Sequence, residues 1–137
     1  MKRFILLLLL FTSLGITTFG QVIKYRTQSW SECKRIETTG EWGEWTENTD
    51  LNILITIDLD NLRIKLYGGE VVVYDIVHFD EESSNERGDI IIKLKCVNDK
   101  GENIVIRHLK PNSNDKVTQL YIDFSDIVMV FNMNKLD

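Results

Sequence analysis

Tryptophans and carboxylates alternate in one short stretch of the chain, and these residues are the first candidates for a chemical role. The tryptophans are Trp30, Trp42 and Trp45, and five acids surround the last two, namely Glu37, Glu41, Glu44, Glu47 and Asp50. Aromatic rings beside carboxylates can bind a sugar or a basic protein, and two carboxylates about 5 to 9.5 Å apart can hydrolyse a glycoside. Because so short a chain leaves little room for a sugar cleft, we interpret the acids as a solvated face.

The tryptophans themselves allow two interpretations. Trp42 and Trp45 are three positions apart, so they face opposite sides of a regular strand, although Gly43 between them can mark a bulge. In the first interpretation, all three tryptophans pack in the core or close the end of a barrel. In the second, one ring stays on the surface, where it stacks on a ligand or anchors a partner.

The two histidines, His78 and His108, could meet across a barrel and bind a metal or move a proton. No third ligand accompanies them, and Asp58 and Asp60 match only half of a calcium loop. No serine or cysteine lies in a nucleophile motif such as G-x-S-x-G. We therefore expect histidines on the surface or at a rim, no catalytic residue, no metal, no cofactor, and a protein that is not an enzyme.

The two cysteines also leave two possibilities. Cys33 lies in a polar stretch, whereas Cys96 ends an alternating run whose apolar positions share one face. A buried free thiol is the simpler interpretation of Cys96, because free cysteine behaves as a small apolar residue. A disulfide between Cys33 and Cys96 is the alternative, since an oxidising compartment would permit it.

The first twenty residues have the three-part layout of a secretory signal peptide. A basic start, Lys2 and Arg3, precedes an apolar run over 4–11 and a tapering polar region, with a cleavage point between Gly20 and Gln21. The apolar run is too short to span a bilayer, which takes about 20 residues. We therefore expect an exported protein, periplasmic or extracellular, with no membrane span after cleavage.

Residues 21–137 then form one domain. Removing the two basic residues of the signal segment leaves a domain more negative than the whole chain, whose net charge is −5. A negative surface repels phosphate backbones and anionic membranes, so nucleic acid is excluded as the expected partner.

Alternating apolar and polar residues predict a succession of strands. The segments are 51–59, 62–66, 71–79, 90–97, 104–109, 117–124 and 127–133, with a weaker candidate at 22–30. Residues 80–88 contain no apolar side chain and are expected to form a solvated loop. The fold class is therefore all-β, a single antiparallel meander of seven or eight strands, and we favour a small barrel over a sandwich because closure removes exposed edges.

Two of these strands are apolar on both faces and supply the candidates for a ligand site. In 71–79 the candidate is Tyr74, and in 127–133 the candidates are Met129 and Phe131, which suit an adaptable apolar cavity as well as a filled core. If Met129 and Phe131 point inward, Val128 and Val130 remain outside, where a partner or the N-terminal segment could cover them. Together with Trp42 and Trp45, these three residues are the predicted ligand-binding set.

Two short motifs carry a resemblance. The chain has GEWGEW at 40–45 and QLYIDF at 119–124, behind a signal segment that ends at Gly20. In this it resembles small exported all-β proteins of gut-type bacteria that lack an assigned function, and the resemblance brings no functional residue with it. A short Gly-x-Trp motif near the start is also a mark of lipocalins, so the architecture is similar to calycin-type barrels.

These observations lead to two expectations of function. The first is an exported, non-catalytic binding module that holds a small apolar ligand in a lipocalin-like barrel. The alternative is a protein-interaction or envelope-structural module that uses the acidic tryptophan segment or the last strand to bind an envelope protein.

Overall fold

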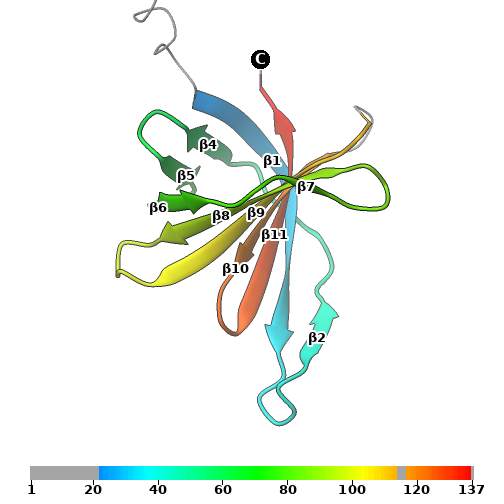
Figure 1. Ribbon diagram of the computed structural model, residues 1–137. Helices are drawn as coiled ribbons and strands as arrows, with labels where there is room; N and C mark the ends of the chain where they lie inside the picture. Colours follow the sequence, from blue (N-terminus) through cyan, green and yellow to red (C-terminus); the bar gives the residue numbers. More distant parts are fainter. Residues whose placement is uncertain (1–21, 114–116, 137) are drawn as a thin grey trace, which may run out of the picture.

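The computed structural model describes residues 22–113 and 117–136, and in them the chain forms strands and no helix. Eight strands make a closed antiparallel barrel: β1 (Val22–Arg35), β4 (Leu54–Asp58), β5 (Arg63–Tyr67), β6 (Val71–Phe79), β8 (Ile90–Val97), β9 (Asn103–Lys110), β10 (Thr118–Asp123) and β11 (Ile127–Lys135). Consecutive members pair as neighbours, and β11 pairs with β1 to close the sheet (Figure 1). The prediction of an all-β meander that closes into a barrel is confirmed.

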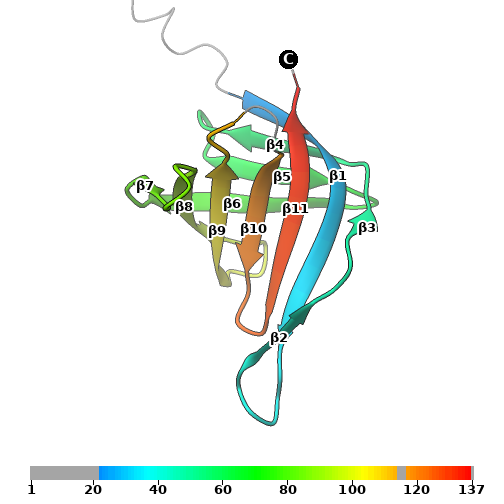
Figure 2. The same ribbon diagram turned by 90° about the vertical axis from the view of Figure 1, so that its right-hand side faces the viewer.

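Three short strands add to the barrel wall. β2 (Trp42–Trp45) and β3 (Thr49–Asp50) pair with β1, and β7 (Ser83–Ser84) pairs with β8. β1 has 14 residues, and its first part pairs with β4 while its last part pairs with β2. Figure 2 shows β1 running the length of the molecule, from the end where the chain terminates to the opposite end, where β2 lies.

A bulge in β1 decides which of its side chains face the interior. Thr27 lies opposite Met133 and Ser29 opposite Asn132, so Gln28 is an extra residue in β1. Tyr25 and Thr27, before the bulge, share the inward face of Met133, which is fully buried in the core. After the bulge, the odd-numbered residues of β1 face outward instead.

The middle of the barrel is filled by aliphatic side chains. The inward positions of each strand supply the fully buried ones, namely Ile55, Ile64, Ile106, Leu120, Ile122 and Met133. A barrel of eight strands is just wide enough for side chains to fill it. A ligand site therefore has to lie at an end of the barrel or outside it.

β6, whose sequence is apolar on both faces, has a paired strand on each side. Its outer face is nevertheless open, because Val71 is 54 % exposed and Val77 is 62 % exposed. Val77 is the extra residue of a second bulge, between Ile76 and His78.

Candidate functional site

A cavity of about 510 Å³ lies at the end of the barrel where β1 begins and β9 and β11 end. Its apolar lining comes from Ile23, Ile90, Ile92, Pro111 and Met133. Its polar lining comes from Tyr25, Glu82, His108, Lys110, Ser113, Thr118, Asn134 and Lys135. We refer to this cavity as the end pocket.

The strand register explains why two lysines line the end pocket. Residues directly opposite each other on antiparallel strands point to the same face. Lys135 is opposite Tyr25, and Tyr25 is buried in the core, so Lys135 occupies an inward position. Lys110 follows the buried His108 by two residues on β9 and is opposite Ile90, which places it on the inward face too.

Tyr25 and His108 form a buried pair at the inner wall of the end pocket. The Tyr25 hydroxyl lies 2.9 Å from His108 Nε2, and the two rings are 5.6 Å apart between centroids. Burial, together with the positive charge of Lys110, lowers the pKa of His108 from 6.5 to about 4. Burial raises the pKa of Tyr25. Both side chains are therefore neutral at neutral pH.

The expectation of surface or rim histidines is wrong for His108, whose side chain is only 9 % exposed inside the barrel. The alternation of β9 is the reason, because His108 shares the inward face of Ile104 and Ile106. His78 does lie on the surface, with Nε2 3.2 Å from a carboxylate oxygen of Asp80.

One nitrogen of His108 has no hydrogen-bond partner. Among buried side-chain nitrogen and oxygen atoms of the described residues, Nδ1 of His108 is left unpaired, because Nε2 is the atom that meets Tyr25. A neutral imidazole carries one donor and one acceptor. An unpaired buried group costs about 1 to 3 kcal/mol, so this wall of the end pocket lacks one polar contact.

A hydrogen-bonded loop forms part of the rim of the end pocket. Asp89 is 4 % exposed, and its carboxylate accepts hydrogen bonds from the Asn85 side chain and from the backbone N–H of Asn112, each at 3.1 Å. The Asn112 side chain donates in turn to the backbone carbonyl of Arg87. The segment expected to be a solvated loop is thus tied to the residues that follow β9.

A second feature, on the outer wall, involves the predicted tryptophans. Trp45 is opposite Cys33 and Trp42 is opposite Arg35, so three steps along β2 match two along β1. This bulge places both tryptophans on the same face, and the expectation of opposite faces is wrong. The Arg35 guanidinium lies 4.8 Å from the centre of the Trp42 ring.

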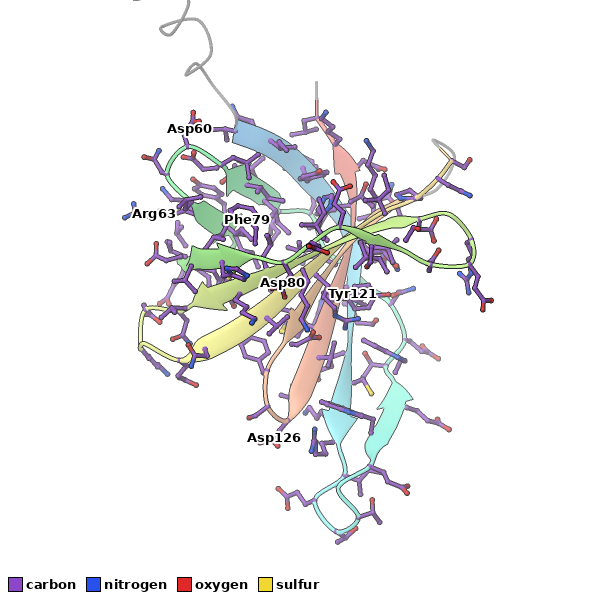
Figure 3. All side chains as sticks on the ribbon, viewed as in Figure 1. Asp60, Arg63, Phe79, Asp80, Tyr121 and Asp126 are labelled. Carbon is purple, nitrogen blue, oxygen red and sulfur yellow. The ribbon has the colours of Figure 1, made fainter. Side chains whose placement is uncertain are left out.

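Trp45 reaches across two strands of the outer wall. Its ring meets the edge of Tyr121 on β10 at 6.2 Å between centroids, although β1 and β11 lie between β2 and β10. Figure 3 shows Tyr121 above the hairpin turn that carries Asp126. The Arg107 guanidinium lies 4.5 Å from the Tyr121 ring and donates two hydrogen bonds of 2.8 Å to Asp123. We call Trp42, Trp45 and Tyr121 the outer aromatic face.

The outer aromatic face explains the burial of two residues outside the barrel. Val130, opposite Tyr121, is 6 % exposed, and Cys33, opposite Trp45, is 4 % exposed. The outer position of Val130 was correctly expected, and its neighbours in register on the two flanking strands are Ser31 and Tyr121. The two tryptophans themselves remain 43 % and 48 % exposed, so the interpretation that packs all three in the core is wrong.

Both cysteines are free thiols on opposite sides of the barrel wall. Cys33 faces outward and its Sγ lies 3.1 Å from the backbone carbonyl of Gly43. Cys96 is buried in the barrel interior, and burial raises the pKa of its thiol to about 12. The buried thiol predicted for Cys96 is confirmed.

The residues predicted to bind a ligand lie away from the end pocket. Tyr74 and Phe131 belong to the filled core, Met129 packs against it, and Trp42 and Trp45 lie outside the barrel. Sequence reasoning missed the residues that line the end pocket, above all Tyr25, His108, Lys110 and Lys135. Because side chains alternate along β9, inward positions for Ile104 and Ile106 would have predicted inward positions for His108 and Lys110 as well.

No group of three or more His, Cys, Asp or Glu residues able to hold a metal ion occurs in 22–113 and 117–136. The same residues include no helix that is long and apolar enough to cross a membrane. The predicted signal peptide, 1–20, lies outside the described residues.

Comparisons with protein-family models, curated proteins and solved structures find no match. The fold and the site therefore define the class on their own: a small closed β-barrel with a filled centre and a pocket at one end. This architecture is compatible with that of calycin-type barrels.

Proposed function

We propose that the protein is an exported, non-catalytic binding module that takes a small apolar ligand into the end pocket. The observation that carries the proposal is a cavity of about 510 Å³ above a filled core, with Ile23, Ile90, Ile92, Pro111 and Met133 in its lining. Small-molecule sites have volumes of roughly 300 to 1,000 Å³ and combine apolar side chains with placed polar groups. The filled core limits the ligand to the end of the barrel, so the protein holds a short molecule or one end of a longer one.

The proposal of a non-catalytic role rests on the chemistry of Tyr25 and His108. A general acid or base works best when its pKa lies near the working pH. The pKa of His108 is lowered to about 4 and the pKa of Tyr25 is raised, so each moves away from neutrality. The pair is better suited to line a dry wall than to move protons.

The proposal of export rests on the sequence of residues 1–20, and the negative charge of the remaining chain keeps an exported domain soluble. We propose the periplasm or the extracellular space as its location, with no nucleic acid among its partners.

Native mass spectrometry of the exported protein, prepared without detergent, tests this function directly. A retained ligand appears as an added mass that leaves on activation. Titration with a neutral apolar fluorophore, N-phenyl-1-naphthylamine, then measures whether the empty pocket binds. Absence of both an added mass and saturable fluorophore binding would refute the proposal.

A matched pair of variants locates the binding. Ile90→Trp fills the end pocket, because Ile90 lines it and is 37 % exposed. Val77→Trp adds the same ring to the outer face of β6, where the side chain is 62 % exposed. We expect Ile90→Trp to abolish fluorophore binding and Val77→Trp to retain it.

A second candidate function is a protein-interaction or envelope-structural module that uses the outer aromatic face. Trp42 and Trp45 are about half exposed beside Arg35, and Trp, Tyr and Arg are the residues that dominate interface energetics. Burial of Val130 favours the tryptophan segment over the last strand as the contact surface. A Trp42→Ala/Trp45→Ala variant should lose an identified envelope partner while the end pocket keeps its fluorophore.

A further inference from the structure

We infer that the end pocket takes an amphiphile with an anionic head group, held at the rim between Lys110 and Lys135 above the apolar wall. The inference rests on the proposed function and adds the chemical class of the ligand. It is carried by the register positions of the two lysines, by the absence of an ion pair to either of them among residues 22–113 and 117–136, and by the charge balance of the pocket.

The two lysines come from different strands but face the same opening. Lys110 ends β9 and Lys135 ends β11, both at inward positions, and both side chains line the end pocket. Ile23 and Met133 line it as well, on strands β1 and β11. A ligand that reaches these aliphatic side chains therefore has its outer end between two ammonium groups.

Neither lysine is neutralised by the described part of the protein. The pairs within 4.0 Å among residues 22–113 and 117–136 involve other residues: the cations Lys34, Arg63 and Arg107, and the imidazole of His78 beside Asp80. The contrast is clearest for Arg107, which is held by two hydrogen bonds to Asp123 on the outer wall.

The charge of the end pocket is opposite to that of the chain. Among its lining residues Lys110 and Lys135 are cationic and Glu82 is anionic, whereas the whole chain has a net charge of −5. His108 adds no charge at neutral pH, because burial and the nearby charge of Lys110 both lower the pKa of its imidazole. A cationic opening in a negative protein selects an anionic group over a neutral or cationic one.

Amphiphiles that share one tail and differ in head group test the inference. Decanoate, decyl sulfate, decanol and decyltrimethylammonium compete with N-phenyl-1-naphthylamine for the exported protein at low ionic strength. Two partly exposed charge contacts correspond to roughly a tenfold preference, so decanoate and decyl sulfate should displace the fluorophore at about one-tenth of the decanol concentration. The cationic amphiphile should be the weakest competitor, and decanoate against decyl sulfate shows whether the head is a carboxylate or a larger oxyanion.

A Lys110→Gln/Lys135→Gln variant should lose the preference for the anions and keep the affinity for decanol. The matched control is Lys93→Gln/Lys95→Gln, which removes the same charge from the outer face of β8 and should keep the preference.

Three results would overturn some part of the argument. Equal displacement by decanol and decanoate refutes the anionic head group but leaves the binding function intact. Loss of the preference in the control variant as well refutes a local role of the two lysines. Failure of the wild-type protein to bind the fluorophore or any amphiphile refutes the proposed function itself.

Discussion

Acidification should destabilise the protein through the buried Tyr25–His108 pair. The pKa of His108 is about 4 in the folded protein and about 6.5 when the side chain is exposed on unfolding. Above pH 6.5 the imidazole is neutral in both states, and this contribution to stability is fully present. As the pH falls from 6.5 towards 4, the unfolded chain takes up a proton that the folded chain does not, so the contribution is lost. The difference in pKa corresponds to about 3 kcal/mol in the free energy of unfolding.

Within the buried pair, the imidazole is the group that titrates in this range. Tyr25 stays neutral, because burial raises its pKa. Urea unfolding monitored by tryptophan fluorescence, repeated at several values between pH 7 and pH 4.5, measures the slope.

The decisive comparison is with a Tyr25→Phe/His108→Leu variant. Replacing both members of a buried hydrogen bond by apolar groups is nearly neutral, so the double variant should resemble the wild type at pH 7 and be less sensitive to acid. Tyr25→Phe alone leaves the imidazole with two unpaired nitrogens and should cost about 1 to 3 kcal/mol at pH 7. His78→Gln, at an exposed histidine, is the control and should leave the slope unchanged. Equal acid sensitivity of the wild type and the double variant, or an NMR titration of His108 with a midpoint above pH 6, would refute the reasoning.

Two further predictions concern the wall and the core. Trp45→Ala should expose Cys33, which is 4 % exposed in the wild type, and speed its reaction with a thiol reagent under native conditions. Trp42→Ala is the control and should have little effect on this rate. An unchanged rate in Trp45→Ala would show that Trp45 does not shield Cys33. Ile106→Ala removes a fully buried side chain and should lower the free energy of unfolding by about 2 to 5 kcal/mol. Val77→Ala, at a 62 % exposed position, should change it by less than about 0.5 kcal/mol, and similar losses in the two variants would show that the core assignment is wrong.

Strand positions were predictable because the two strands of a hairpin and the turn that joins them are close together in the sequence. The segments 71–79 and 90–97 coincide with β6 and β8, since each has a run of β-branched or alternating residues bounded by turn residues. Closure of the barrel depends instead on the pairing of β1 with β11, whose partners are about a hundred residues apart, such as Trp30 and Phe131. Alternation favours a closed sheet but does not say which strands meet.

The faces of side chains were less predictable, because one bulge reverses every assignment beyond it. Counting by two along β1 from Tyr25 would put Cys33 inside, but the extra residue Gln28 puts it outside. The bulge of β2 beside Gly43 brings Trp42 and Trp45 to one face in the same way. A glycine between two tryptophans was the available signal, and it indicated a bulge without fixing its effect.

The end pocket could not be predicted from the sequence, for a different reason. Tyr25 and His108 are separated by 83 positions in the sequence and meet only after the barrel closes. Alternation along β9 shows that His108 and Lys110 point to the same side as Ile104 and Ile106. It does not show how close these two residues lie to the end of the barrel. The predicted ligand residues Tyr74 and Phe131 come from strands that are apolar on both faces, and their inward positions place them in a filled core.

The bulge in β1 separates the two surfaces that could bind a partner. Before Gln28 the strand presents Tyr25 to the end pocket, and after it presents Cys33 to the outer aromatic face at the other end of the barrel. One strand thus contributes to both surfaces, but through opposite faces and without a shared side chain. Substitutions at sites that share no partners have additive effects. Filling the end pocket and removing the tryptophans should therefore act independently, so the binding data can assign each ligand or partner to one surface.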